Sequence, residues 1–404
     1  MAATLTAFNV ALERTWTQKR LEEMLFQNTA TLDMIEKTTK YAVGETARVP
    51  LHVSRNGGYT VLPDGGGNLN TAGNQGLQKT EYSYTNHHQQ VAIQGDVLDR
   101  ASSSAHAIAN VLDVEVNGAL NDMRRQLQRQ IFGNGDALIA QCRTSDSNDV
   151  DLNITSGGNA LARGWLFVGQ PVDVGTTANE VAIADGRTIT AVTESATIPT
   201  LTVSGAAVST EGTTHYVSHQ NARAGTTSYE MNGLRNLVAT SGTFGTLATS
   251  TESSWAAAGV NSTAQPISLS LLMQAQQSVH QKTGAPADWI ICGLKQQRKL
   301  YEQLQQQIRY SGDSAINAGD PSKVKFQGMT ITVDPDCPDE DLYIGSRKHL
   351  FIVATDKPYW QNKHSGGEIL SWIQGTDSYG AKLTYRINLG SNRRNAFYRF
   401  SALS

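Results

Sequence analysis

The hydrophobic pattern of residues 45–95 predicts a hairpin that projects from the rest of the protein. Residues 46–54 alternate, with one side apolar, and so do parts of Lys79–Ile93, which is typical of half-buried strands. Between them, residues 55–78 hold seven glycines and four asparagines, too few apolar side chains to form a core. We expect an arm whose tip is mobile unless a partner orders it, the alternative being an ordinary disordered surface loop.

A long amphipathic helix is predicted next, over residues 102–132. Apolar side chains recur every three or four positions, at Ile108, Leu112, Val116, Leu120, Met123, Leu127 and Ile131. Ser102–Ser104 supply N-cap candidates, and Gly133 is the expected residue after the last turn. The helix would be about 40 Å long. Gly118 lies in its interior at a cost of about 1 kcal/mol relative to alanine, which indicates either close packing or a bend.

The pattern changes at residue 145 and again near residue 228. Residues 145–226 contain short alternating segments between turn signals, which predicts a small β-barrel or sandwich. The remainder mixes helices, at Ile267–Thr283 and Leu294–Ile308, with strands at Trp289–Cys292, Val324–Val333, Leu342–Ala354 and Ala381–Asn388. A further helix over Gln18–Asn28 has a narrow apolar face, which suits docking on a partner or on its own domain equally well.

Composition argues against several classes of protein. The formal net charge is −3 and 17% of residues are charged, so there is no basic surface for tight nucleic-acid binding, although a local patch could contact DNA weakly. Cys142, Cys292 and Cys337 are scattered and odd in number, which favours neither disulfides nor a thiolate zinc site. No secretory signal and no apolar run long enough to span a membrane are present.

The search for chemistry predicts no catalytic residue, no cofactor-binding residue and no metal ligand. Familiar catalytic and phosphate-binding motifs are absent. The acidic stretch at residues 334–341 lacks the spacing of a calcium loop, so we interpret it as a solvated turn. His87 and His88 should face opposite sides of a strand. Arg393 and Arg394 could bind phosphate or pair with a neighbouring subunit's carboxylates, and the charge balance favours the second.

The order of these segments resembles the major capsid proteins of tailed bacteriophages, whose fold is shared with encapsulin shells and herpesvirus capsid floors. The resemblance rests on the long loop, the helix ending in IFGNGD, EMNGLRNLV, ADWIICGLKQQRKLYEQL, VKFQGMTITVDPDCP, LYIGSRKHLFI and NLGSNRRNAFYRF. It implies an α+β phage capsid fold with an N-terminal arm (1–44), an extended loop (45–95), a spine helix of the peripheral domain (96–144), a β-rich insertion domain (145–226), an axial domain with peripheral segments (227–340) and C-terminal strands of both domains (341–404).

The same resemblance implies a function. The chain would self-assemble into hexamers and pentamers of an icosahedral head that encloses double-stranded DNA, without being an enzyme. It would lie in the virion after assembly in the host cytoplasm. Implied partners are copies of itself, a separate scaffolding protein, a portal protein, a cement or decoration protein and weakly contacted DNA, with no membrane. The candidate residues for contact between subunits are Arg48, Tyr59, Asn68, Lys79, Arg393 and Arg394, and Gly118 is the candidate hinge.

Three alternatives remain open. An encapsulin-type shell protein would share the fold, while a phage tail or decoration protein, or a carbohydrate-binding β protein, would not need the long helix. An enzyme is the third alternative. Some relatives of the resembled family join a loop lysine covalently to a neighbour's asparagine, but Lys79 lies at the base of the predicted loop, so we expect non-covalent stabilisation.

Overall fold

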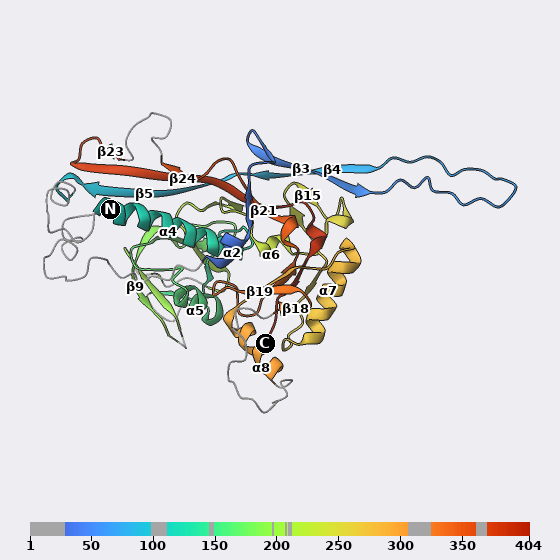
Figure 1. Cartoon of the computed structure of the whole chain (residues 1–404). Helices are drawn as coiled ribbons and strands as arrows, with labels where there is room; N and C mark the ends of the chain where they lie inside the picture. Colours follow the sequence, from blue (N-terminus) through green and yellow to red (C-terminus); the bar gives the residue numbers. More distant parts are fainter. Residues whose placement is uncertain are drawn as a thin grey trace, which may run out of the picture.

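Three six-stranded sheets and a projecting hairpin make up the computed structural model (Figure 1). It describes residues 29–97, 111–144, 149–195, 198–206, 208, 212–305, 325–360 and 370–404. The predicted α+β class is confirmed. The helix predicted at Gln18–Asn28, the N-cap candidates Ser102–Ser104 and the last residues of the helix predicted at Leu294–Ile308 lie outside the described residues.

The hairpin is built from β3 (Thr46–Ser54) and β4 (Gly76–Ser83), with β2 (Ala42–Val43) beside β3. Inward residues of β3 are buried and outward ones exposed, as the alternation predicts. The prediction that Lys79–Ile93 forms one strand of the hairpin is wrong, because strand pairing is interrupted at Tyr84 and the chain passes from one sheet to another. Beyond it, β5 (Thr85–Gln94) leaves the hairpin and joins another sheet.

The hairpin counts as the first sheet, and β5 belongs to the second. The second sheet is organised around the longest strand, β24 (Ser378–Ser391), which includes the predicted strand at Ala381–Asn388. The whole length of β5 pairs with one edge of β24, along the segment Ser378–Ile387. The other edge pairs with β21 (Leu350–Ala354), β22 (Tyr359–Trp360) and β23 (Ser371–Trp372). β1 (Glu36–Thr38) adds to β21 in parallel, so a segment near the N-terminus completes the sheet. The long helix α4 (Val111–Ile131) packs beside β5 (Figure 1).

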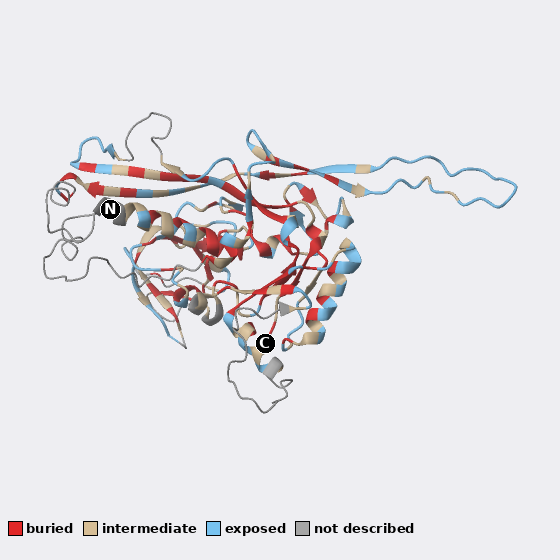
Figure 2. Cartoon of the chain, in the orientation of Figure 1, coloured by how far each residue is buried: buried red, intermediate tan, exposed pale blue. Residues whose placement is uncertain are grey.

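The third sheet is largely buried (Figure 2). Its order is β16 (Gly259–Asn261), β25 (Phe397–Phe400), β20 (Leu342–Gly345), β17 (Trp289–Cys292), β19 (Met329–Val333) and β18 (Lys325–Phe326). Helix α7 (Leu269–Thr283) contacts β25, β16 and β20, and α8 (Leu294–Gln305) follows β17. Ser268 caps α7, and left-handed Gly284 ends it. The helix predicted at Ile267–Thr283 is therefore confirmed, with its start two residues later.

Two segments that were each predicted as one strand form two strands in the structure. Within Val324–Val333, Gln327 and Gly328 both have positive φ, at 47° and 84°, and turn the chain into the hairpin β18–β19. Within Leu342–Ala354, a 3-10 turn at Arg347–His349 sends β20 and β21 to different sheets. In both segments the break falls on glycine and polar residues, Gln327–Gly328 and Gly345–His349, which separate the apolar positions on either side.

Residues 140–219 form a closed sheet with its own core, which begins before the boundary predicted at residue 145. Its order is β6 (Ala140–Gln141), β11 (His215–His219), β8 (Pro171–Thr176), β9 (Ala184–Thr193), β10 (Thr200–Val203) and β7 (Val150–Asp151). The N–H of Asn153 donates to the carbonyl of Gln141 at 2.9 Å, and that of Arg143 to Asp151 at 3.0 Å. These bonds join the first strand to the last, and α5 (Ile154–Ala162) contacts β6.

Short elements connect these sheets. Helix α2 (Ala30–Met34) precedes β1, and α6 (Leu234–Leu237) follows the insertion. The remaining short elements are β12 (Arg223–Ala224), β13 (Thr227–Ser228), β14 (Thr243–Phe244), β15 (Leu247–Ala248), Ser253–Trp255 and Arg394–Ala396. Gly133 is not the left-handed residue expected after α4. The positive φ, 74°, belongs to Gly135, because the chain first makes a tight turn in which Gly133 N–H donates to Gln130.

Candidate assembly surfaces and the junction behind them

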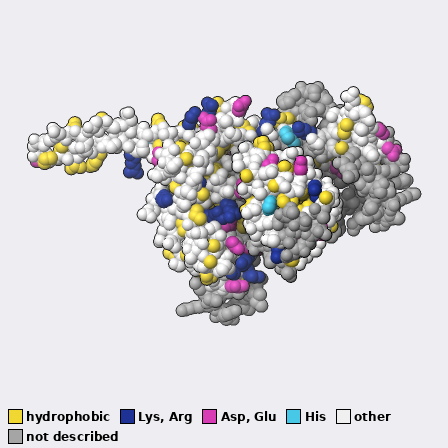
Figure 3. Space-filling view, turned by 180° about the vertical axis from the view of Figure 1, so that it is seen from behind, with side chains coloured by type: hydrophobic (Ala, Val, Ile, Leu, Met, Phe, Trp, Pro, Cys, Tyr) yellow, Lys and Arg dark blue, Asp and Glu magenta, His cyan; other side chains and the backbone are white. Residues whose placement is uncertain are grey.

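The tip of the hairpin projects beyond the body of the molecule and presents apolar side chains to solvent (Figures 1 and 3). Strand pairing ends at Ser54 and Gly76, and residues 55–75 form no strand. Tyr59 is 82% exposed, and Leu69 is 77% exposed. The other large apolar residues exposed on the hairpin are Val61, Leu62 and Leu77. A monomer gains nothing by holding such side chains in water, so this surface is suited to a partner.

Two asparagines hold the legs of the tip together where the strand ladder has stopped. Asn56 donates to the carbonyl of Gly73 at 2.5 Å and accepts from its N–H at 3.1 Å. Asn70 donates to the carbonyl of Tyr59 at 2.8 Å, and its own N–H donates to Thr60 at 2.9 Å. The asparagine content that marks the segment as unable to form a core thus gives it a defined shape.

The root of the hairpin carries charges and a buried anchor. Glu81 pairs with Arg48 at 3.3 Å and with Lys79 at 2.8 Å, and the Lys79 hydrogen bond lowers the pKa of its carboxyl. Behind them, Tyr82 is 1% exposed and its hydroxyl donates to the carbonyl of Ser391 at 2.7 Å. Its ring meets Phe244 edge-on at 5.5 Å. The root is therefore fixed, while the tip is free of the body.

The six predicted contact residues fall into three places. Arg48 and Lys79 lie at the exposed root, Tyr59 and Asn68 lie in the exposed tip, and Arg393 is partly buried on the body. Arg393 donates to the carbonyl of Thr283 at 2.9 Å. Arg394 is 1% exposed and donates to carbonyls of its own chain, so the prediction that it contacts a neighbour is wrong.

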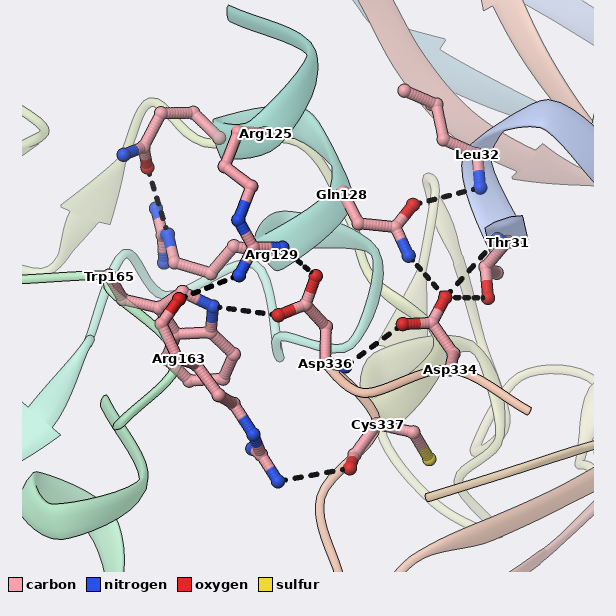
Figure 4. A network of polar contacts seen from close by, with 11 residues as sticks. Thr31, Leu32, Arg125, Gln128, Arg129, Arg163, Trp165, Asp334, Asp336 and Cys337 are labelled. Atoms are coloured by element: carbon pink, nitrogen blue, oxygen red, sulfur yellow. Dashed lines mark hydrogen bonds and ion pairs between the residues drawn. The ribbon is translucent and has the colours of Figure 1, made fainter. Parts of the chain in front are cut away.

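A buried polar junction lies behind these surfaces, where four parts of the chain meet (Figure 4). Its centre is Asp334, 0% exposed, in the turn after β19. The Asp334 carboxylate accepts from the Thr31 hydroxyl at 2.5 Å and from the Thr31 N–H at 3.2 Å. It also accepts from the Gln128 side chain on α4, whose own oxygen accepts from Leu32 N–H at 2.9 Å. One carboxylate thus fastens α2 to α4 and to the third sheet.

The second carboxylate of the junction, Asp336, reaches the insertion. It is 0% exposed, pairs with Arg125 of α4 and accepts from the Trp165 indole N–H at 3.1 Å. Arg125 also donates to the carbonyl of Arg163 at 2.7 Å, and Arg163 donates to that of Cys337 at 3.2 Å. The interpretation of residues 334–341 as a solvated turn is therefore wrong. Prolines and acidic residues are typical of exposed turns, but here the buried carboxylates are matched by donors on α2, α4, β25 and the insertion.

Electrostatics of the junction reflect this burial. Desolvation raises the pKa of Asp334, while hydrogen bonds from Thr31 and Asp336 N–H act in the opposite direction. The three cysteines are buried and free, and burial raises the pKa of the Cys292 thiol to about 12. A buried thiol with a high pKa is unreactive.

The insertion is fastened to α4 a second time through a neutral histidine. The His219 ring lies 2.9 Å from Gln126 Oε1 on α4 and 2.9 Å from Gln170 Nε2, which sets Nε2 as the donor and Nδ1 as the acceptor. Burial and nearby Arg129 lower the pKa of His219 to about 3. Arg129 in turn pairs with Glu230, both nearly buried. No pattern in the sequence predicts this contact, because His219 and Gln126 are 93 residues apart and only the fold brings them together.

Gly118, the predicted hinge of α4, has free space around it. A Cβ built at this position meets no atom within 4 Å among the described residues. Close packing against the described part of the same subunit is therefore not the reason for a glycine here, and the prediction of a bend stays a prediction.

Within the described ranges, no three histidine, cysteine or acidic side chains gather as a metal site. No described helix is both long and apolar enough to cross a membrane.

Comparison with known proteins gives a consistent result. Residues 210–363 match the family described as SU10 major capsid protein. A search of curated proteins finds no significant sequence match. The fold is similar to that in a cyanophage A-1(L) capsid (TM-score 0.53, 9% identity, 95% of both chains) and in a native GTA particle capsid (TM-score 0.54, 8% identity, 100% of both chains). It is also similar to that in the capsid of Myoviridae phage XM1 (TM-score 0.50, 8% identity, 100% of both chains).

Proposed function

We propose that this chain, a major capsid protein of the tailed-phage type, builds an icosahedral head from hexamers and pentamers of itself. The observation that carries this proposal is the projecting hairpin, rooted by buried Tyr82 and ending in exposed Tyr59 and Leu69. A tip with no core of its own and a fixed root is suited to reach a neighbouring copy. The role is structural and not enzymatic.

The sheets suggest how the subunit is divided in the shell. The second sheet, with β24, β5 and α4, would form the peripheral domain, and the third sheet with α7 would form the axial domain around the capsomer centre. The junction at Asp334 and Asp336 joins the two and holds α2 against both. A shell subunit moves as one unit during assembly, and the buried junction would keep its two domains in a fixed relative position.

The partners follow from the same role. A separate scaffolding protein would guide shell curvature, a portal would occupy one vertex, and a cement or decoration protein could bind outside. Contact with packaged double-stranded DNA would be weak and non-specific, because the formal net charge is −3.

Electron microscopy of the purified protein, with and without a co-expressed scaffolding protein from a related phage, tests this proposal. We expect closed shells, and DNA in particles recovered from an infection. A protein that stays monomeric under every condition would overturn it. Shells that form unaided around a protein cargo would favour the encapsulin alternative.

A further inference from the structure

A hollow in the body lies next to the root of the hairpin. It has a volume of about 370 Å³, in the range of sites that hold a small organic group. It is lined only by small residues, whose side chains present hydroxyl and methyl groups: Thr240, Ser241, Gly242, Thr243, Ala248, Thr249, Ser250, Ser253 and Ala256. Such a lining accepts an apolar ring that also carries a hydroxyl.

The walls of this hollow are held rigidly. Arg394, buried behind it, donates to the carbonyls of Leu237 at 2.7 Å and Asn236 at 3.0 Å, and lies 3.4 Å from those of Ser241 and Gly242. Its guanidinium carbon stands 5.6 Å from the ring centre of Phe244. One cation therefore fixes the backbone on one side of the hollow. A site that is already ordered loses little entropy when it binds.

The hollow and the hairpin root are parts of one structure. The β14–β15 turn that lines the hollow rests on β4, where Glu81 N–H donates to Thr246 at 3.1 Å. A side chain at Gly245, in that turn, would strike Thr80 Oγ1 at 2.2 Å, so the contact needs a glycine. Each copy therefore presents a protruding tip and, at the root of the same hairpin, a concave site.

We infer that the hollow receives the hairpin tip of a second copy, with Tyr59 as the leading side chain. This rests on the proposed shell function and names its receiving site. Tyr59 offers an apolar ring and a hydroxyl, which match the methyl and hydroxyl lining. A tip-to-hollow contact is head-to-tail, and such contacts close into rings when the rotation fits. The leg from Ser54 to Tyr59 spans up to about 17 Å, so Tyr59 can lie well beyond the end of the strand pairing.

Disulfide trapping tests the inference. Tyr59→Cys and Thr249→Cys are placed on two differently tagged copies, co-assembled and oxidised. The native cysteines are buried and should not react. We expect a covalent dimer that carries both tags and disappears with reductant. The matched control pairs Tyr59→Cys with Phe167→Cys, an exposed site on the insertion, and should give no such dimer.

Failures of the two proposals are distinguishable. Shells of normal appearance without the mixed dimer overturn the inference and leave the shell function intact. An unsubstituted chain that forms no shell overturns both. Should the cysteine variants not assemble, Thr249→Trp decides. By filling the hollow, it should leave the melting temperature of the monomer unchanged and weaken capsomers at least tenfold. Capsomers of normal stability would contradict the inference.

Discussion

Asp334 is the residue whose chemistry most affects the subunit, because one carboxylate serves α2, α4 and the third sheet. Asp334→Asn keeps the shape but replaces one acceptor oxygen by a donor that faces other donors. Hydrogen bonds to a charged group contribute about 1.5–3 kcal/mol each, so we expect the free energy of unfolding to fall by about 3 kcal/mol. Urea unfolding measures it. Asp33→Asn, which removes the exposed pair with Arg124, is the matched control and should cost less than about 1 kcal/mol.

Acid should loosen the contact between the insertion and α4. His219 has a folded pKa of about 3, and His87, also lowered by burial and Arg129, one of about 4. A depressed histidine pKa means that the unfolded chain binds the proton first. Stability is therefore unaffected above pH 6.5, the ordinary histidine value, and is lost as pH falls toward 4, by up to about 1.4 kcal/mol per pH unit for each histidine.

The raised pKa of Asp334 has the opposite effect on stability as pH falls. The prediction therefore concerns only the part of the pH dependence that His219 contributes. His219→Gln should flatten the decline between pH 6.5 and 4, while exposed His52→Gln should leave it unchanged. Thermal melting across this range measures both. An equal slope in His219→Gln and the unsubstituted protein would contradict the prediction.

At the scale of elements, the hairpin tip should matter for assembly and not for folding. Deletion of Asn56–Gly76 removes exposed residues and the asparagine bonds between the legs. We expect a soluble subunit with nearly unchanged melting temperature and shells that are weak or absent. Calorimetry and electron microscopy measure the two effects. A deletion that unfolds the monomer, or shells of normal strength, would sink the assignment of this segment to contacts between subunits.

Gly118 gives a separate prediction for α4. Since a Cβ meets nothing within 4 Å, Gly118→Ala should fit and add about 1 kcal/mol of helix stability. If the helix bends there during shell expansion, the variant should favour whichever shell form holds it straighter. Structures of precursor and expanded particles decide the point, and an equally straight α4 in both would remove the hinge.

The sequence predicts elements well where one face is buried and poorly where both are. The alternation of β3 and the helical pattern of α7 are local signals, and both predicted elements are confirmed. The breaks at Gln327–Gly328 and Arg347–His349 fall on glycine and polar residues, so the sequence carries a signal for them. The break at Tyr84 carries none, because it follows from the pairing of β5 with β24, which lies far away in the chain. The buried junction was missed for the same reason. Asp334 is separated from Thr31 by 303 residues, and only the fold brings its donors together.

At the scale of the whole molecule, the subunit has a rigid body, a hairpin root fixed to that body and a tip that projects from it. The buried carboxylates keep the parts of the subunit together, Tyr82 and Phe244 hold the hairpin root, and the tip extends away from both. Because contacts inside the subunit keep it folded, each of the many contacts between subunits can be weak. Misplaced copies can then leave before a shell closes.

A cryo-electron microscopy reconstruction of the assembled particle tests the central claim most directly. The account predicts a closed icosahedral shell of hexamers and pentamers in which each hairpin tip lies on a neighbouring copy, with the Asp334 junction intact in every subunit. A particle without such capsomers, or a shell whose hairpin tips contact no neighbour, would contradict it.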